Sequence, residues 1–499
     1  MRRTACCLAV CLLGLCAAHA SELRRVHPFA ECTADELPGH LEGSLERLDL
    51  AGLRNDWVHK AFAVTVSPGE TEAGVTLGLT GDTELLRHIR LRVVGFVQQT
   101  PHGWVMDPIF DRPGEIDPSY GQWVRNFDGI RRFPTVLATP ANPVVVWVTA
   151  DTRGLAAGTY SGAVTVQPPR EPLRRVPLRL VVQPVELPVD NPLICCGWQW
   201  IPAAPTKVDG ARTFFDYGIN ATHVLADMEA SRRAGFRYFM FVFGPSWKGQ
   251  APEEVPEADV DKAIAEIKAT VRKLRLRPEE WALYTIDEPN DRAVPNQVRW
   301  CAHLRRKWPE AQFIFNPGWG PGPRNEWGTV QGTVEPLSPL VDVWLPYSHW
   351  LWDEASGTSL PLMKKHARQV WFYEIMNFPY TRRPSVGRDM LRTLPWVAWK
   401  YDLQGCSWYS LNAISQVPYM DDVAGKEYAA SYYTVPARSL EALREGFQEY
   451  KRMQALRRLG VDEATLNGFT NRALNARSVR DYDVLRRDMD RLLIALTER

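Results

Sequence analysis

Two adjacent carboxylates, each able to donate or accept a proton, end an apolar stretch of this sequence. The segment WALYTIDEPND (281–291) is typical of a buried strand up to Asp287 and Glu288, and Pro289 follows them. Proline lacks an N–H and favours an extended backbone at Glu288, so the strand should stop there. Adjacent carboxylates raise each other's pKa, so one can stay protonated as a general acid. The same residues also suit a helix N-terminus, so the motif alone leaves a catalytic pair and a helix cap equally open.

The acid pair belongs to a region, residues 189–435, in which apolar strands alternate with amphipathic helices. Apolar residues from Val260 to Leu274, for example, recur at the spacing of one helical face. Eight such units over this length predict a (β/α)8 barrel of the TIM type, whose parallel strands are covered on both faces and so are almost continuously apolar. The expected strands are 193–200, 218–225, 236–244, 281–287, 312–318, 341–348, 369–375 and 404–412.

In such a barrel the chemistry gathers at the carboxyl ends of the strands, where Asp287 and Glu288 end the fourth. Consecutive strand residues point to opposite faces, so two neighbours can both reach the mouth only where a strand stops. Other strand ends offer candidate binding residues, although core packing or turn capping suits each of them as well. The aromatic candidates are Trp198, Trp200, Tyr347, Tyr373, Trp408 and Tyr409, and the amide candidates, which would bind hydroxyl groups, are Asn316 and Asn412.

The sequence on either side of this region follows other patterns. Residues 21–188 show short alternating apolar runs broken by Gly and Pro, which predicts an N-terminal β-sandwich. Residues 436–499 are charged and helical, with Leu440, Leu443 and Phe447 on one face of the first helix. We therefore expect a multidomain α/β protein in which a β-sandwich precedes the barrel and C-terminal helices pack on it.

Residues 1–20 are typical of an export signal. Two arginines precede a short apolar run, and Ala-His-Ala at the end is a small-x-small cleavage sequence. The run is too short to span a bilayer. We expect a mature protein that begins near Ser21, is periplasmic or extracellular, and has no stable membrane anchor.

The composition excludes some partners and favours another. A net charge of +1 gives no reason to expect nucleic acid. The cysteines beyond the export signal are scattered, without metal-ligand spacing or a dense disulfide framework, and we expect neither a metal nor another cofactor. No protein partner is evident. The chain has 19 Trp, and exposed indoles are the usual platform on which sugar rings stack, so a carbohydrate is the favoured ligand.

Four segments together resemble the family 123 glycoside hydrolases, a family of β-N-acetylgalactosaminidases. The segment VWVTADTRGLAAGTYSGAVTV is similar to the family's N-terminal sandwich signature, and YTIDEPND to its acid pair after strand four. Further along, LRTLPWVAWKYDLQGCSWYSLN resembles its strand-eight region, and PARSLEALREGFQEYKRM its C-terminal helix. The acid pair alone is weakly specific, but the four segments in this order cover most of the mature chain.

The resemblance implies retaining hydrolysis of terminal β-linked N-acetylhexosamine, assisted by the substrate. The 2-acetamido oxygen would attack the anomeric carbon and give an oxazolinium, an exception to the two-carboxylate scheme. Asp287 would then hold the acetamide N–H, and Glu288 would act as general acid and then general base. The family also has a tryptophan at the position of Trp408, which implies that this residue is a wall for the acetamido group.

Two other hypotheses stay open. Glu374 ends strand seven, and many barrel glycosidases without acetamide assistance place a nucleophilic Glu there and an acid/base Glu, often directly before proline, after strand four. In that enzyme Glu374 would be the nucleophile and Glu288 the acid/base; in the acetamide-assisted one Glu374 would only contact substrate. The third hypothesis is a carbohydrate-binding protein that has lost activity, since a fold does not fix a function.

Overall fold

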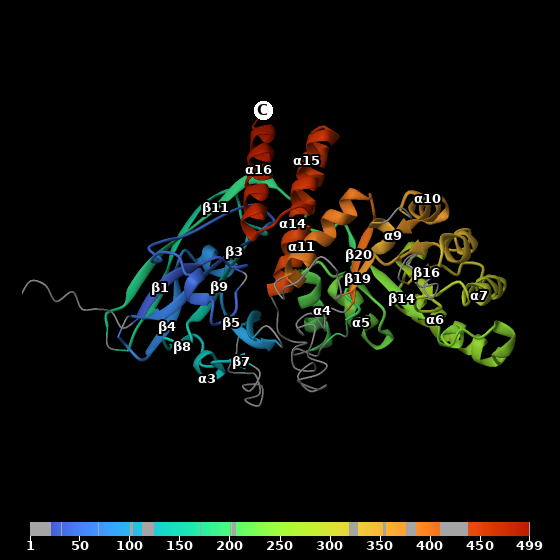
Figure 1. Cartoon of the computed structure of the whole chain (residues 1–499), viewed down its shortest axis with the longest axis horizontal. Helices are drawn as coiled ribbons and strands as arrows, with labels where there is room; N and C mark the ends of the chain where they lie inside the picture. Colours follow the sequence, from blue (N-terminus) through green and yellow to red (C-terminus); the bar gives the residue numbers. More distant parts are fainter. Residues whose placement is uncertain are drawn as a thin grey trace, which may run out of the picture. The chain divides into compact units, whose positions relative to one another are not determined.

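The chain divides into two compact units, Met1–Pro184 and Val185–Arg499 (Figure 1). The computed structural model describes residues 21–30, 32–67, 69–99, 103–111, 124–169, 171–199, 201, 206–318, 328–352, 356–375, 386–409 and 438–498.

The first unit contains two antiparallel sheets. In one, the order is β1 (Ser21–Val26), β3 (Trp57–Val66), β9 (Val144–Asp151), β5 (Ile89–Gln99) and β6 (Gly103–Phe110), with β7 (Val124–Arg125) also paired to β5. In the other, it is β2 (Leu48–Arg54), β11 (Arg174–Glu186), β10 (Gly158–Gln167), β4 (Ala73–Gly81) and β8 (Thr135–Ala138). The short helices are α1 (Leu37–His40), α2 (Thr83–His88) and α3 (Phe127–Ile130).

The two sheets of this unit contact each other through β3, which touches β2, β4 and β8. Burial alternates along β11, and the central strand β9 is buried over nearly its whole length. The period-two pattern of the sequence therefore predicted the β-rich character of this unit correctly. A sandwich in the strict sense stays a prediction.

The second unit is built on one parallel sheet. Its strands are β12 (Ile194–Cys196), β13 (Ala221–Thr222), β14 (Tyr238–Val242), β15 (Trp281–Tyr284), β16 (Phe313–Phe315), β17 (Val343–Trp344), β18 (Gln369–Val370), β19 (Tyr373–Ile375) and β20 (Gly405–Tyr409). The order across the sheet is β18-β17-β16-β15-β14-β13-β12-β20-β19. Each strand region expected from the sequence contains at least one of these strands.

The sheet curls. Strands β18 and β19 are consecutive in the chain, at 369–375, yet they lie at opposite ends of the sheet order. A parallel bridge between Tyr347 and Tyr373 adds a further link between the regions of strands six and seven. This places the carboxyl ends of strands four to seven on the same side of a curved parallel sheet. A closed eight-stranded barrel stays a prediction.

Helices connect the strands and lie along the outside of the curled sheet (Figure 1). They are α4 (Lys207–Asp216), α5 (Met228–Ala234), α6 (Glu257–Lys273), α7 (Val294–Lys307), α8 (Glu335–Leu337), α9 (His349–Trp352), α10 (Ser356–His366) and α11 (Val386–Lys400). Single turns are η3 (Leu225–Asp227), η4 (Gly244–Ser246), η5 (Pro252–Glu254), η6 (Pro278–Glu280) and η7 (Val330–Val334). The stripe predicted on α6 is buried at Val260, Ile264 and Ile267, so this face is the one that packs on the sheet.

Three helices end the chain: α14 (Arg438–Arg458), α15 (Glu463–Leu474) and α16 (Val479–Thr497). α14 packs against α11 and α16, and Tyr217 donates a hydrogen bond of 2.9 Å to Glu441 on α14. The apolar face predicted for α14 is buried, but so are many of its charged residues, which pair with Arg392 on α11 and with α16. None of the helices in the described part of the chain has a span that is apolar and long enough for a bilayer crossing.

Candidate active site

Asp287 and Glu288 lie three and four residues beyond the end of β15, and both are exposed to solvent. The sequence predicted an extended backbone at Glu288, and this is wrong: its φ is +42°, in the left-handed region. Side chains other than glycine seldom adopt this conformation, so surrounding contacts must hold it. One of these contacts is a 3.1 Å hydrogen bond from the Glu288 N–H to Asn316 Oδ1.

Two donors from neighbouring strands hold the Asp287 carboxylate. The Tyr284 hydroxyl at the end of β15 donates to Asp287 Oδ1. Asn316 Nδ2, directly after β16, donates to the same oxygen at 2.9 Å. Burial, followed by the charge of Asp287, raises the pKa of Tyr284 well above its ordinary value, so the phenol stays protonated and remains a donor. Asp287 is therefore fixed through Oδ1.

A different residue donates a hydrogen bond to Glu288. The Tyr373 hydroxyl, on β19, donates to Glu288 Oε1. Partial burial of the carboxylate raises the pKa of Glu288, the hydrogen bond from Tyr373 opposes that rise, and the charge of Asp287 adds to it. A raised pKa keeps a fraction of this carboxyl protonated at higher pH, which is what a general acid needs.

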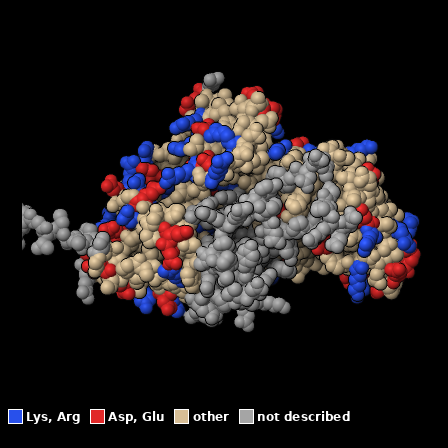
Figure 2. Space-filling model, in the orientation of Figure 1, with Lys and Arg blue, Asp and Glu red and all other residues tan. Residues whose placement is uncertain are grey.

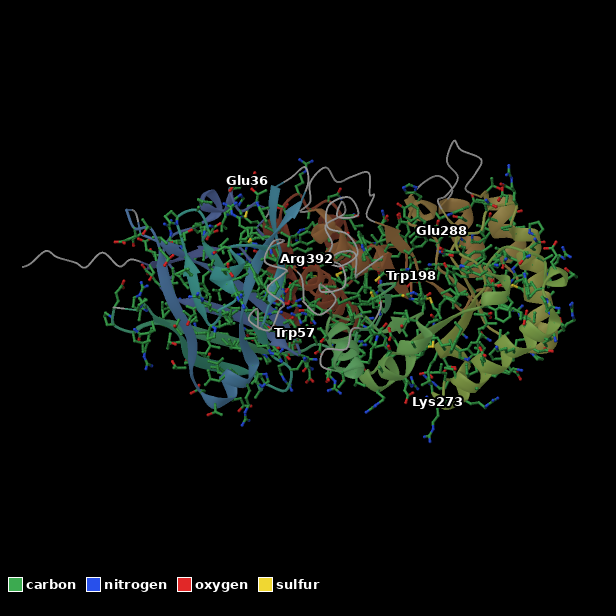
Figure 3. The ribbon with its side chains drawn as sticks, turned by 90° about the horizontal axis from the view of Figure 1, so that it is seen from below. Glu36, Trp57, Trp198, Lys273, Glu288 and Arg392 are labelled. Carbon is green, nitrogen blue, oxygen red and sulfur yellow. The ribbon has the colours of Figure 1, made fainter. Side chains whose placement is uncertain are left out.

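Aromatic rings form a wall on the Asp287 side of the pair. The ring of Tyr284 lies 5.4 Å from the ring of Trp198 and 5.3 Å from that of Trp247, centroid to centroid. His223 lies 5.0 Å from Trp198, and burial lowers its pKa to about 4 against the attraction of two nearby carboxylates. The imidazole is therefore neutral at neutral pH. Figure 3 labels Trp198 and Glu288 within the same unit.

Tyr347 and Glu374 lie on the other side of Tyr373. The rings of Tyr347 and Tyr373 are 5.3 Å apart, and the Glu374 carboxylate lies near enough to the Tyr347 hydroxyl to interact with it electrostatically. Burial, then Glu374 and then Glu288, raise the pKa of Tyr347. Glu374 itself is only 1% exposed. Glu374 is thus covered, whereas Glu288 is exposed.

The structure gives Trp408 a different setting from Trp198. Its cross-strand partner is Glu374, and it is 2% exposed. By alternation it shares a face of β20 with Cys406, and its contact with an acetamido group stays a prediction.

The remaining sequence candidates divide into two groups. Asn316 is brought to the acid pair, where both polar atoms of its amide bond the acids, and its contact with sugar hydroxyls stays a prediction. Trp200 and Asn412 lie outside the described residues, as does the side chain of Tyr409.

Three residues near the acids were not predicted. Tyr284 looked like one more apolar strand residue, although its place three positions before Asp287 was a usable signal. His223 and Trp247 follow strands two and three, in loops whose path the sequence does not reveal. Trp247 is 38% exposed, so part of its indole is accessible to solvent.

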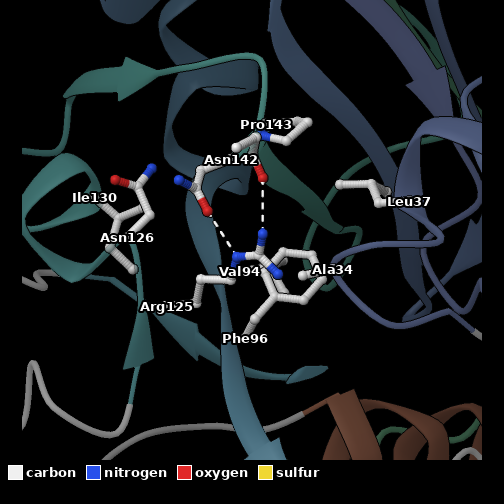
Figure 4. A pocket seen from close by; sticks show the side chains of 10 residues that line it. Ala34, Leu37, Val94, Phe96, Arg125, Asn126, Ile130, Asn142 and Pro143 are labelled. Atoms are coloured by element: carbon white, nitrogen blue, oxygen red, sulfur yellow. Dashed lines mark hydrogen bonds between the residues drawn. The ribbon is translucent and has the colours of Figure 1, made fainter. Parts of the chain in front are cut away.

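On the described part of the face in Figure 2, acidic and basic side chains are interspersed. In the described residues, no three His, Cys, Asp or Glu side chains are grouped as metal ligands would be. A pocket in the first unit is bordered by Arg125, whose guanidinium already bonds Asn142 at 2.7 Å, the Ala141 carbonyl at 3.0 Å and Asp35 at 2.6 Å (Figure 4).

Comparison with solved structures supports the fold. A family 123 glycoside hydrolase from Clostridium perfringens, described in connection with glycolipid glycan hydrolysis, matches with a TM-score of 0.55 over 96% of this chain and 98% of its own, at 11% identity. The fold is similar to that of a glycoside hydrolase.

Two other solved glycoside hydrolases match at TM-scores too low to support the fold. A family 39 glycoside hydrolase from Bacteroides cellulosilyticus WH2 gives a TM-score of 0.39 at 12% identity, covering 81% of this chain and 82% of its own. A Bacteroides ovatus family 5 xyloglucanase gives 0.28 at 8% identity, covering 81% and 98%. No protein-family model matches the sequence, and no curated protein matches it either.

Proposed function

We propose that this chain is a retaining glycoside hydrolase that removes terminal β-linked N-acetylhexosamine, with N-acetylgalactosamine as the first candidate. The observation that carries the proposal is the different setting of two neighbouring acids. Asp287 is held through one oxygen by Tyr284 and Asn316. Glu288 is held by Tyr373, and partial burial raises its pKa. One acid is thus suited to bind and stabilise charge, and the other to transfer a proton.

Each acid has one task in the proposed reaction. The acetamide oxygen attacks the anomeric carbon while Glu288 gives its proton to the leaving oxygen, so the glycosidic bond breaks and an oxazolinium forms. Asp287 accepts the acetamide N–H and offsets the positive charge. Glu288, now ionised, takes a proton from water as the water attacks the anomeric carbon. Two inversions at one carbon give net retention.

The setting of Glu374 argues against the rival mechanism. A nucleophile must reach the anomeric carbon, and Glu374 is only 1% exposed. The exposed Asp287 next to Glu288 has no role in direct displacement by Glu374, but it has one when the acetamide is the nucleophile. A non-catalytic binding protein would not need a carboxyl with a raised pKa.

The same proposal extends to the other segments of the chain. Residues 189–435 would close into a (β/α)8 barrel with the acid pair at its mouth, preceded by a β-sandwich at 21–188 and followed by helices at 436–499. Residues 1–20 would direct the protein out of the cytoplasm. The substrate would be a glycan or glycoconjugate with an N-acetylhexosamine end.

A substrate screen tests the proposal. Aryl β-glycosides with and without a 2-acetamido group should be compared on the wild type and on Glu288→Gln. We expect turnover of the acetamido substrates only, inhibition by a thiazoline that mimics the oxazolinium, and strong loss in the variant. Efficient cleavage of plain glucosides or galactosides, insensitive to the thiazoline, would favour the rival with Glu374.

A further inference from the structure

Asn316 contacts both acids at once, from the strand next to theirs. It directly follows β16, which pairs in parallel with β15 through Leu283 with Phe313 and Tyr284 with Ile314. Parallel neighbours end on the same side of a sheet, so the residues that follow the two strands meet there. The side chain is 2% exposed, which leaves little of it for a substrate.

The hydrogen bonds of Asn316 fix the orientation of its amide. Oδ1 accepts from the Glu288 N–H at 3.1 Å, and Nδ2 donates to Asp287 Oδ1 at 2.9 Å. A backbone N–H can only donate and an ionised carboxylate can only accept, so a flipped amide would oppose like groups at both contacts. The side chain therefore links the backbone of one acid to the carboxylate of the other in a single geometry.

This link explains the unusual backbone of Glu288. A φ of +42° is disfavoured for a residue with a Cβ, and a side chain of this kind adopts it only where contacts hold it there. The bond to Asn316 is one such contact. Gly318 supplies the space, because a Cβ at that position would lie 3.1 Å from Glu288 Cβ. This turn allows Asp287 and Glu288, which are consecutive in the chain, to face a common site.

We propose that Asn316 is a positioning residue that sets the relative placement of Asp287 and Glu288. It occupies Asp287 Oδ1, so that Oδ2 is the oxygen that meets the acetamide N–H, and it anchors the Glu288 backbone so that its carboxyl reaches the leaving oxygen. This inference rests on the proposed function and deepens it. A misplacement of about 1 Å can cost about 100-fold in rate, so the effect should be measurable.

Two substitutions separate the two contacts. Asn316→Asp keeps the acceptor for the Glu288 N–H, removes the donor to Asp287 and adds a negative charge beside both acids. Asn316→Ala removes both contacts without adding charge. We expect kcat to fall about 10- to 100-fold in each, with a smaller change in KM. In Asn316→Asp the added charge should also raise the pKa of Glu288, so the alkaline limb of the kcat/KM profile should move to higher pH.

Asn220 offers a matched control. It is 1% exposed, accepts from the Cys195 N–H at 2.8 Å and donates to the Leu193 carbonyl at 2.9 Å, so it links strand regions one and two as Asn316 links four and five. Asn220→Ala should lower the melting temperature about as much as Asn316→Ala and leave kcat and the pH profile of the folded protein unchanged. Asn316→Ala variants that match this control in activity as well as in stability would overturn the inference.

A measurement without turnover keeps this test separate from the proposed function. The titration of Glu288 can be followed by infrared spectroscopy, as the difference between a protein and the same protein carrying Glu288→Gln. The midpoint of this titration should move to higher pH in Asn316→Asp and stay in place in Asn220→Ala. If the wild type cleaves no acetamido glycoside, the proposed function fails and this titration still tests whether residue 316 is coupled to Glu288. An unmoved titration in Asn316→Asp would contradict it.

Discussion

Tyr373 donates its hydroxyl hydrogen to the carboxylate of Glu288, although 85 positions separate them in the chain. The bond joins the end of strand seven to the end of strand four. It opposes the rise in the pKa of Glu288 that burial causes, so the proton affinity of the candidate acid depends on both strand ends.

Removing that hydroxyl should shift the pH profile. In Tyr373→Phe the ionised form of Glu288 loses a donor, so its pKa rises further. Glu288 acts first in its protonated form, and the alkaline limb of kcat/KM should therefore move to higher pH, by about one unit for a hydrogen bond to a charged group. Tyr482→Phe, which removes a hydroxyl bonded to the Ala473 carbonyl in the C-terminal helices, is the control and should leave the limb unmoved.

The two acids should differ in their dependence on the leaving group. Glu288→Ala should slow substrates with poor leaving groups by roughly 100- to 10,000-fold and activated aryl glycosides far less, since these leave without a proton. Azide should restore part of the second step, because a small anion needs no general base. Equal losses for both substrate classes would argue against Glu288 as the acid/base.

Asp287→Ala should impair both substrate classes, because oxazolinium formation is common to them. Asp287→Asn should impair both classes too, since its single amide oxygen cannot both accept from Tyr284 and Asn316 and meet the acetamide N–H, and it supplies no charge. Steady-state kinetics on the same aryl series measures this. A nearly normal Asp287→Ala would remove the residue from the mechanism.

Glu374→Gln should have a small effect on turnover. The amide has nearly the same volume as the carboxylic acid, so a buried residue that takes no part in the chemistry should tolerate the change. We expect kcat to stay within about tenfold of wild type, whereas loss of a nucleophile would cost several orders of magnitude. Turnover abolished in Glu374→Gln, with Asp287→Ala nearly normal, would establish the rival mechanism.

The C-terminal helices should depend on one buried ion pair. Glu449 on α14 is 0% exposed and accepts from Arg392 Nε at 3.0 Å and from Trp396 Nε1 at 2.7 Å. Glu449→Ala removes the nearer of two buried carboxylates at Arg392, with Glu445 remaining at 3.7 Å, and should reduce the free energy of unfolding by about 3–5 kcal/mol. Glu463→Ala, which breaks the exposed pair with Arg457, should change it little. Thermal unfolding compares the two; equal shifts would contradict the prediction.

The sequence predicted the location of the strands because parallel strands covered on both faces are apolar runs bounded by polar loops. It did not predict which residues of those runs face the site. An apolar run has no period-two signal, so Trp408 could be placed on its strand but not on a face. Trp198, whose φ is +50°, leaves the strand geometry altogether and contacts Tyr284 instead.

The acid pair could be predicted from the sequence, but the residues that hold it in place could not. Asp287 and Glu288 stand out as adjacent carboxylates at the end of an apolar run, but the left-handed turn at Glu288 depends on Asn316 and Gly318 from another strand. The charged residues of α14 are likewise buried, and their partners Arg392 and Arg486 come from helices far away in the chain. Both arrangements depend on contacts between residues that are far apart in the sequence.

A series of aryl N-acetylhexosaminides with zero, one, two and three fluorines on the acetyl methyl tests the central claim most directly. Each fluorine withdraws electrons from the acetamide oxygen and weakens it as a nucleophile, while the leaving group stays the same. If the acetamide attacks the anomeric carbon, kcat/KM should fall steeply with each added fluorine. A rate that is independent of fluorine number would show that the acetamide does not take part.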